Sequence, residues 1–215
     1  MPLMSLKQEI LLRLTLLKAP YERYVSKMQY LEHIIPLSEI SFYQKKAAEK
    51  IHAEKWEGRN IQQKIENFVN CWVTEEAFKQ ILIKHGAFFR HRALYVGDAA
   101  GAGADFMVKR NGQWITIGIR SIGADSVYRW KSVAYPEDRF MDEQDKISDY
   151  VVACYNKRGF VKFFGIVDKE TLLHALKHSE RRRSGKNQEW FRKVPLALFS
   201  LERLEQFLES TGKRQ

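Results

Sequence analysis

The sequence has few cysteines and no long uncharged apolar stretch. It contains 2 cysteines among 215 residues, at positions 71 and 154, which is too few for a disulfide scaffold or a cysteine-rich zinc site. The longest apolar runs are short, and charges interrupt them, as Arg13 does within residues 10–17. A membrane-spanning helix needs about 20 apolar residues. We therefore expect reduced, buried cysteines and no membrane partner.

The N-terminal segment also lacks the features of a secretory leader. Lys7, Glu9 and Arg13 interrupt its leucines at helical spacing, and no small-residue cleavage site follows them. We interpret this segment as the N-terminus of a mature cytoplasmic protein.

Several enzyme motifs are missing as well. The glycines at 97, 101 and 103 do not have the spacing of a phosphate-binding loop, and no GxSxG elbow is present. His174 and His178 lie four residues apart, but the glutamate of a zincin motif is absent between them. We interpret these features as a surface loop and a solvated helix face.

Positive charge is abundant. The formal net charge is +10, and 45% of the residues are hydrophobic, which is enough for a core. A basic surplus attracts polyanions such as nucleic acid, and salt weakens that attraction. The plain alternative is a protein that is merely basic.

The first third has the periodicity of helices. Apolar residues recur at three- and four-residue steps, and prolines, glycines and N-cap residues separate the segments. Predicted helices cover residues 6–17, 21–34, 38–56, 61–72 and 77–84, with Thr74 as an N-cap and Gly86 as a terminator.

After residue 86 the pattern changes. Asn111-Gly112 between two apolar runs predicts a hairpin. We predict strands at 105–108, 114–119, 150–155, 161–167 and 194–199, helices at 168–178 and 201–208, and loops at 97–104, 121–142 and 180–187. The sequence thus predicts a helical N-terminal region, residues 1–70, followed by an α/β core, residues 71–215.

Asp105 and the strand that follows it suggest a chemical site. A carboxylate at the head of one strand and alternate positions on its antiparallel neighbour are expected on one face. Metal-dependent phosphodiesterases gather ligands in this way, with a cation stabilising charge on the phosphate. The alternative is that Asp105 is a turn or cap carboxylate.

At these residues the chain resembles the PD-(D/E)XK superfamily, the fold of restriction endonucleases, over about residues 70–170. Asp105 matches the family's Asp, and Glu75 or Glu76 matches the Glu of the preceding helix, with Glu76 as our predicted ligand. Gly118-Ile119-Arg120 falls where Glu-x-Lys is expected. The resemblance implies a restriction-endonuclease-like mixed sheet under a helical N-terminal layer, and Mg²⁺ held by Asp105 and Glu76.

Two departures from that pattern leave the function open. Gly118 carries no carboxylate, and Arg120 cannot lose its proton as a lysine can. An active enzyme would need substitute groups from Asp125, Glu143 or Gln144, with Arg120 stabilising phosphate charge. We therefore expect either a Mg²⁺-dependent DNA endonuclease or a protein that has lost cleavage and kept nucleic-acid binding.

Basic clusters mixed with aromatic residues favour nucleic acid, most of all DNA, as the partner. The alternative for each cluster is a solvated face, and a protein-interaction module without a nucleic-acid role also stays open, as does a homodimer. The predicted contact residues are Arg90, Arg92, Arg129, Lys131, Arg181, Arg182, Arg183 and Lys186.

Overall fold

A computed structural model describes residues 29–53, 60–92, 104–137, 144, 147–183 and 189–212. Its main element is a six-stranded mixed sheet in the order β1-β7-β6-β4-β3-β2, in which β4 and β6 are parallel and the other neighbours antiparallel. The strands are β1 (Leu31–Ile34), β2 (Phe89–His91), β3 (Phe106–Arg110), β4 (Gln113–Ser121), β6 (Tyr150–Lys157) and β7 (Phe160–Asp168). The predicted α/β class is therefore confirmed at this level.

A smaller antiparallel sheet has the order β5-β9-β8. Its strands are β5 (Ser132–Pro136), β8 (Arg181–Arg183) and β9 (Trp190–Pro195). The described helices are α2 (Leu37–Ala53), α3 (Ile61–Lys84), the π-helix η1 (Ser126–Trp130), α5 (Lys169–His178), the 3-10 helix η3 (Leu196–Leu198) and α6 (Leu201–Thr211).

Two turns set the register of the central hairpins. In the predicted β3–β4 turn, Asn111 has φ +49° and Gly112 has φ +79°, as a type I′ turn requires at both central residues. Arg110 consequently pairs with Gln113, and Phe106 pairs with Ile117. The β6–β7 turn uses positive φ at Arg158 and Gly159 in the same way.

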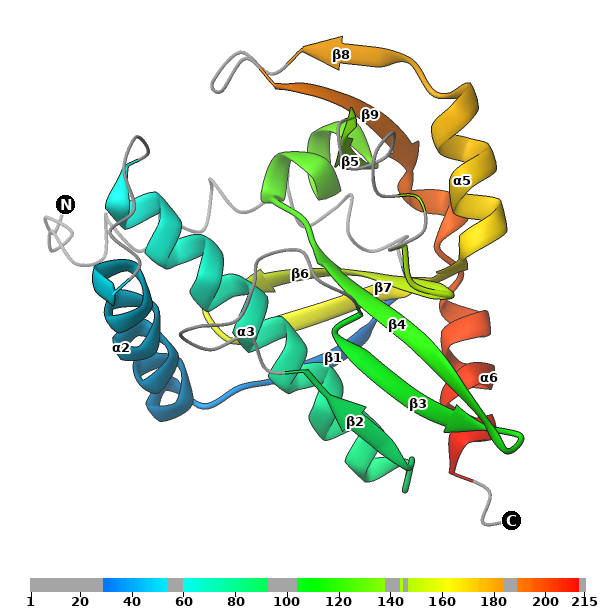
Figure 1. Ribbon diagram of the computed structural model, residues 1–215, viewed down its shortest axis with the longest axis horizontal. Coiled ribbons are helices and arrows are strands. Elements are labelled where there is room, and N and C mark those ends of the chain that lie inside the picture. Colours follow the sequence, from blue (N-terminus) through cyan, green and yellow to red (C-terminus); the bar gives the residue numbers. More distant parts are fainter. Residues whose placement is uncertain are drawn as a thin grey trace, which may run out of the picture.

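Each face of the main sheet carries a separate apolar core. One core joins the sheet to α3 and α6, and α2 packs against α3 (Figure 1). The opposite core joins it to α5 and to β5 and β9 of the small sheet. Because side chains alternate between the faces of a strand, neighbouring residues of β4 belong to different cores: Ile117 and Ile119 face α3, and Gly118 and Arg120 face the small sheet.

Helix α3 is continuous, whereas the sequence predicts two helices over the same residues. The Thr74 hydroxyl, predicted to cap a second helix, donates instead to the backbone oxygens of Asn70 and Cys71 within the helix. The predicted end at Gly86 is confirmed, since this residue has φ +68° just after the last turn. The helix also runs through residues 70 and 71, where the sequence analysis placed a boundary.

Four segments differ from the expected secondary structure. The predicted strand at 194–199 lies earlier, as β9 (Trp190–Pro195), and Leu196–Leu198 form the 3-10 helix η3. Residues 31–34, predicted as helix, form β1 because they pair with β7 and so become the edge strand of the main sheet. Residues 181–183, predicted as loop, form β8 because β9 supplies hydrogen-bonding partners. The predicted loop at 121–142 contains η1 and β5. The predicted helix at 6–17 and the glycine loop, apart from Ala104, lie outside the described residues.

Within these described ranges, no helix has the length and apolar character needed to cross a membrane.

Candidate functional site

Asp105 lies one residue before β3, where the β3–β4 ladder ends. Its Oδ2 accepts a hydrogen bond of 2.6 Å from the Ile119 backbone N–H. The carboxylate therefore takes the acceptor role that a backbone carbonyl would have if the strands stayed paired. The removal of water from this group raises its pKa to about 7, and the nearby charge of Glu75 adds to the rise.

Glu75 reaches the same place from α3. Its side chain is buried, and its Oε2 lies 3.1 Å from Nε2 of His91. The His91 ring stacks on Phe106 with centroids 4.4 Å apart, which fixes it under the helix. Burial raises the pKa of Glu75, although the contact with His91 opposes that rise. Asp105, Glu75 and His91 form what we call the acidic cluster.

Glu76 points elsewhere because successive side chains on a helix are about 100° apart. It accepts hydrogen bonds from Lys79, Gln80 and the Tyr43 hydroxyl. Burial alone would raise the pKa of Glu76, but these hydrogen bonds lower it overall. The structure thus brings Asp105 next to Glu75 and leaves Glu76 in a separate network between α2 and α3.

Arg120 is not brought to the acidic cluster. Its Nη2 donates to the Ala134 backbone oxygen at 2.8 Å, and its guanidinium lies 5.0 Å from the centre of the Tyr135 ring. These partners belong to the small sheet, on the face of β4 away from α3. The space beside Gly118 holds the buried Ser148, whose Oγ would be 3.2 Å from a Cβ at position 118.

The described side chains do not form a complete metal centre. Within residues 29–53, 60–92, 104–137, 144, 147–183 and 189–212, no group of three or more His, Cys, Asp or Glu side chains is placed to hold a metal ion. Asp105, Glu75 and His91 lie in one cluster, but these described side chains are not placed to hold a metal ion together. The described side chains therefore do not supply a full ligand set for Mg²⁺.

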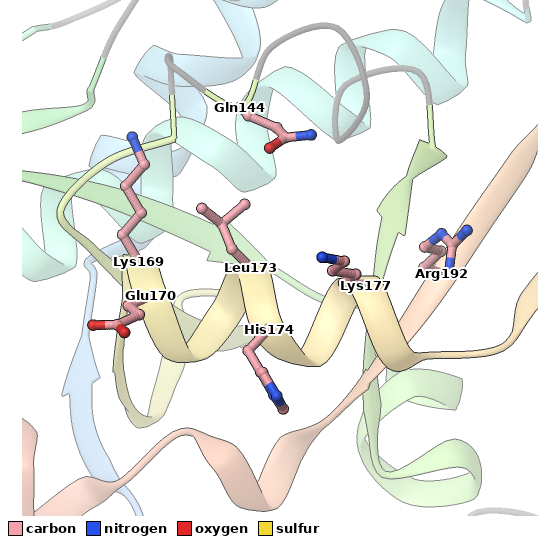
Figure 2. A pocket seen from close by; sticks show the side chains of 7 residues that line it. All are labelled: Gln144, Lys169, Glu170, Leu173, His174, Lys177 and Arg192. Carbon is pink, nitrogen blue, oxygen red and sulfur yellow. The ribbon is translucent and has the colours of Figure 1, made fainter.

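Gln144 lines a cavity of about 800 Å³ along α5. Figure 2 shows that most of the lining residues come from that helix, with Arg192 contributed by β9. Because α5 covers the face of the sheet opposite α3, Gln144 lies apart from the acidic cluster. The remaining lining residues are Lys169, Glu170, Leu173, His174 and Lys177.

The predicted arginine run alternates between the two faces of the small sheet. Arg181 forms an ion pair with the buried carboxylate of Glu137, which Arg192 also contacts at 3.2 Å. Arg182 pairs with exposed Glu180. Arg181 thus has a structural role in addition to any surface role. Lys186, which was also predicted to contact nucleic acid, lies outside the described residues.

This difference predicts unequal effects on stability. Arg181→Ala should lower the free energy of unfolding by about 1 kcal/mol, because Glu137 loses one of its two cations. Arg182→Ala should change it by less than about 0.5 kcal/mol, because its partner is exposed. Urea unfolding of both variants at pH 7 measures the difference, and equal losses would contradict the assignment.

Several cations lie over aromatic rings at the surface. Arg90 lies 4.8 Å from the Trp114 ring centre, Lys193 lies 4.2 Å from that of Trp130, and Arg181 lies 4.0 Å from that of Trp190. The predicted residues Arg129 and Lys131 flank Trp130 and are exposed. Arg92 differs, because its backbone N–H bonds the Asp105 backbone oxygen and its charge lowers the pKa of Asp105.

Three residues beside these rings were not predicted from the sequence: Phe88 and Lys109, which lie beside Trp114, and Lys193, which lies over Trp130. The contact of His91 with Glu75 was not predicted either. The alternation of residues 106–110 and 113–121 could have placed Lys109 beside Trp114, since the two are direct cross-strand partners. His91 belongs to the short strand β2, and Phe88 directly precedes that strand, whose pairing only the fold reveals. No protein-family model and no curated protein matches this sequence.

Proposed function

We propose that this protein binds nucleic acid through its basic surface, on a restriction-endonuclease-like fold that serves binding rather than cleavage. The observation that carries the proposal is the pairing of surface tryptophans with cations. Trp114, Trp130 and Trp190 each have an Arg or Lys side chain within 5 Å of the ring centre. Rings can stack on bases while the cations neutralise phosphates.

The order of elements supports the fold part of the proposal. Asp105 precedes the second strand after α3, and α3 carries Glu75 beside it, as the resemblance implies. The site favours binding over hydrolysis because Arg120 faces the small sheet and Ser148 lies where a carboxylate at position 118 would be needed.

Binding should depend steeply on salt. A labelled 30-bp duplex should be retained at 50 mM salt and released at several hundred mM. Replacing Arg129, Lys131 and Lys193 with Gln should make the slope of log affinity against log salt less steep, by the contribution of up to about three phosphate contacts. The matched control replaces Lys45, Lys84 and Lys157, three exposed lysines on other elements, with Gln. It therefore has the same net charge as the test variant.

Two results would contradict this proposal. The first is no retention of nucleic acid at 50 mM salt. The second is an equal loss of slope in the two triple variants, because net charge alone would then explain binding.

Metal-dependent cleavage is the second candidate, and one observation favours it. Asp105 and Glu75 bring two carboxylates together, and burial raises the pKa of both. A divalent cation would stabilise the ionised forms of these two carboxylates. The described residues leave the ligand set of such a cation incomplete. Supercoiled plasmid incubated with Mg²⁺ or Mn²⁺ distinguishes the candidates.

In that assay, binding alone predicts intact plasmid for the wild type. The endonuclease predicts nicking that Asp105→Asn and Glu75→Gln abolish. Glu76→Gln serves as the matched control, because Glu76 lies in a different hydrogen-bond network, and it should leave any nicking unchanged.

A further inference from the structure

The face of β2, β3 and β4 that points away from α3 carries a surface group of aromatic and basic side chains, in which Phe88, Arg90 and Lys109 are exposed and Trp114 is half-buried. Phe88 is opposite Lys109, Lys109 pairs with Trp114, and Arg90 pairs with Met107. Cross-strand partners point to the same face, so Phe88, Arg90, Lys109 and Trp114 lie together. We call these four residues the platform.

The platform is open to solvent at its edge. Phe88, which directly precedes β2, is 64% exposed, more than Phe42 at 51% or Phe160 at 49%. Its ring centre lies 5.6 Å from that of Trp114, and the two planes are inclined by 41°. The rings therefore touch without covering each other by parallel stacking.

Charge on this face is of one sign. Lys109 lies 5.9 Å from the Phe88 ring centre, and Arg90 lies 4.8 Å from that of Trp114. The only acidic residue in the described parts of the segments 88–92 and 104–121 is Asp105, whose carboxylate belongs to the acidic cluster under α3. At the border of the face, the Asp149 carboxylate is occupied by hydrogen bonds from the backbone and hydroxyl of Thr116.

We propose that the platform binds single-stranded nucleic acid, with bases stacked on Phe88 and Trp114 and phosphates held by Arg90 and Lys109. Bases in a duplex are stacked on one another, whereas unpaired bases offer free faces to an exposed ring. Phe88 and Trp114 come from the two sides of β3, and their ring centres lie 5.6 Å apart, so the two rings can receive neighbouring bases of one strand. This inference rests on the proposed nucleic-acid binding and names the strand form that it recognises.

The test compares a labelled 20-mer of deoxythymidine with a 20-bp duplex by fluorescence anisotropy, at 50 mM salt. The wild type should bind the single strand more tightly. Phe88→Ala should weaken single-strand binding roughly 5-fold to 100-fold, because base stacking on a ring contributes about 1–3 kcal/mol, and Phe88→Tyr should restore it. Duplex binding should change by less than 3-fold.

Phe160→Ala is the matched control, because Phe160 is an exposed phenylalanine on β7, at 49%, and it should leave both affinities unchanged. Lys109→Gln should reduce the salt slope for the single strand by about 0.7, whereas Lys45→Gln on α2 should not. Circular dichroism melting verifies that each variant folds.

The outcomes separate the two proposals. If the wild type binds neither ligand at 50 mM salt, nucleic-acid binding itself is wrong. If the duplex binds as tightly as the single strand, or Phe88→Ala has no more effect than Phe160→Ala, the platform is not the single-strand site, and binding through the small sheet still stands. Either of these last two results is also expected if the platform is instead a docking patch for a protein partner.

Discussion

Asp105→Asn should make the protein more stable than the wild type above pH 7, and this advantage should vanish as the pH falls to 4. Desolvation and the charge of Glu75 raise the Asp105 pKa from 3.8 to about 7. Between these values the folded protein holds a proton that the unfolded chain has released, so the free energy of unfolding falls as pH rises. An amide at this position removes that penalty while keeping an acceptor for Ile119.

The expected gain is about 2–3 kcal/mol at pH 8. A shift of three pKa units corresponds to about 4 kcal/mol, and we take a smaller value because Asp105 keeps some access to water. Urea unfolding of both proteins at pH 4, 5.5, 7 and 8.5 measures the difference. A gap that does not change with pH would show that Asp105 titrates normally.

Glu76→Gln is the control, because its effect on the free energy of unfolding should have the opposite sign to that of Asp105→Asn. Hydrogen bonds from Lys79, Gln80 and Tyr43 lower the pKa of Glu76, so its ionised form stabilises the fold above the pKa of the unfolded chain. That stability is lost as the pH falls through the lower, folded-state pKa. The Gln variant should therefore be less stable than the wild type at pH 7 and approach it at acidic pH.

Gly165→Ala should be among the most destabilising single substitutions in this protein. Gly165 has φ +148° in β7, and a Cβ there would lie 2.3 Å from the Ser200 carbonyl carbon and 2.6 Å from that of Phe199. Next to it, Ile166 exchanges two backbone hydrogen bonds with Ser200, the residue that caps α6. The added methyl group must push the start of α6 off the sheet.

We expect a loss of more than about 3 kcal/mol, from backbone strain and overpacking together. Gly123→Ala is the matched control, because a Cβ at that exposed glycine meets nothing within 4 Å, and it should change stability by less than about 1 kcal/mol. Thermal and urea unfolding compare the two variants. Similar stabilities would mean that the β7–α6 contact can move without cost.

Local sequence signals predicted the elements whose cause is local. Asn111-Gly112 and Gly159 mark turns because these residues adopt positive φ, and the strands beside them were predicted to within a few residues. Asp168 caps α5 by accepting from the Thr171 backbone N–H, and Ser200 caps α6 in the same manner. Such signals operate within four residues and therefore need no knowledge of the fold.

The acidic cluster shows where such signals end. Strand alternation predicts Asp105 on the same face as Arg120, because residue 105 would be opposite residue 118 if the ladder continued. The ladder stops at Phe106, so the carboxylate turns to the Ile119 N–H and approaches α3. Side chains alternate between the two faces only where the strands are paired. How many residues of β3 and β4 pair is decided by the tertiary structure.

The sequence by itself determined the mixed α/β class after residue 86, the two tight turns, the starts of α5 and α6 and the positive charge, because each depends on residue type and short spacing. The tertiary structure alone decided that Glu75 rather than Glu76 lies beside Asp105, that Arg120 faces the small sheet, and that residues 31–34 and 181–183 are strands. These features depend on which edges and faces meet across long stretches of chain, and hydrogen-bonding partners from distant strands override local preference there.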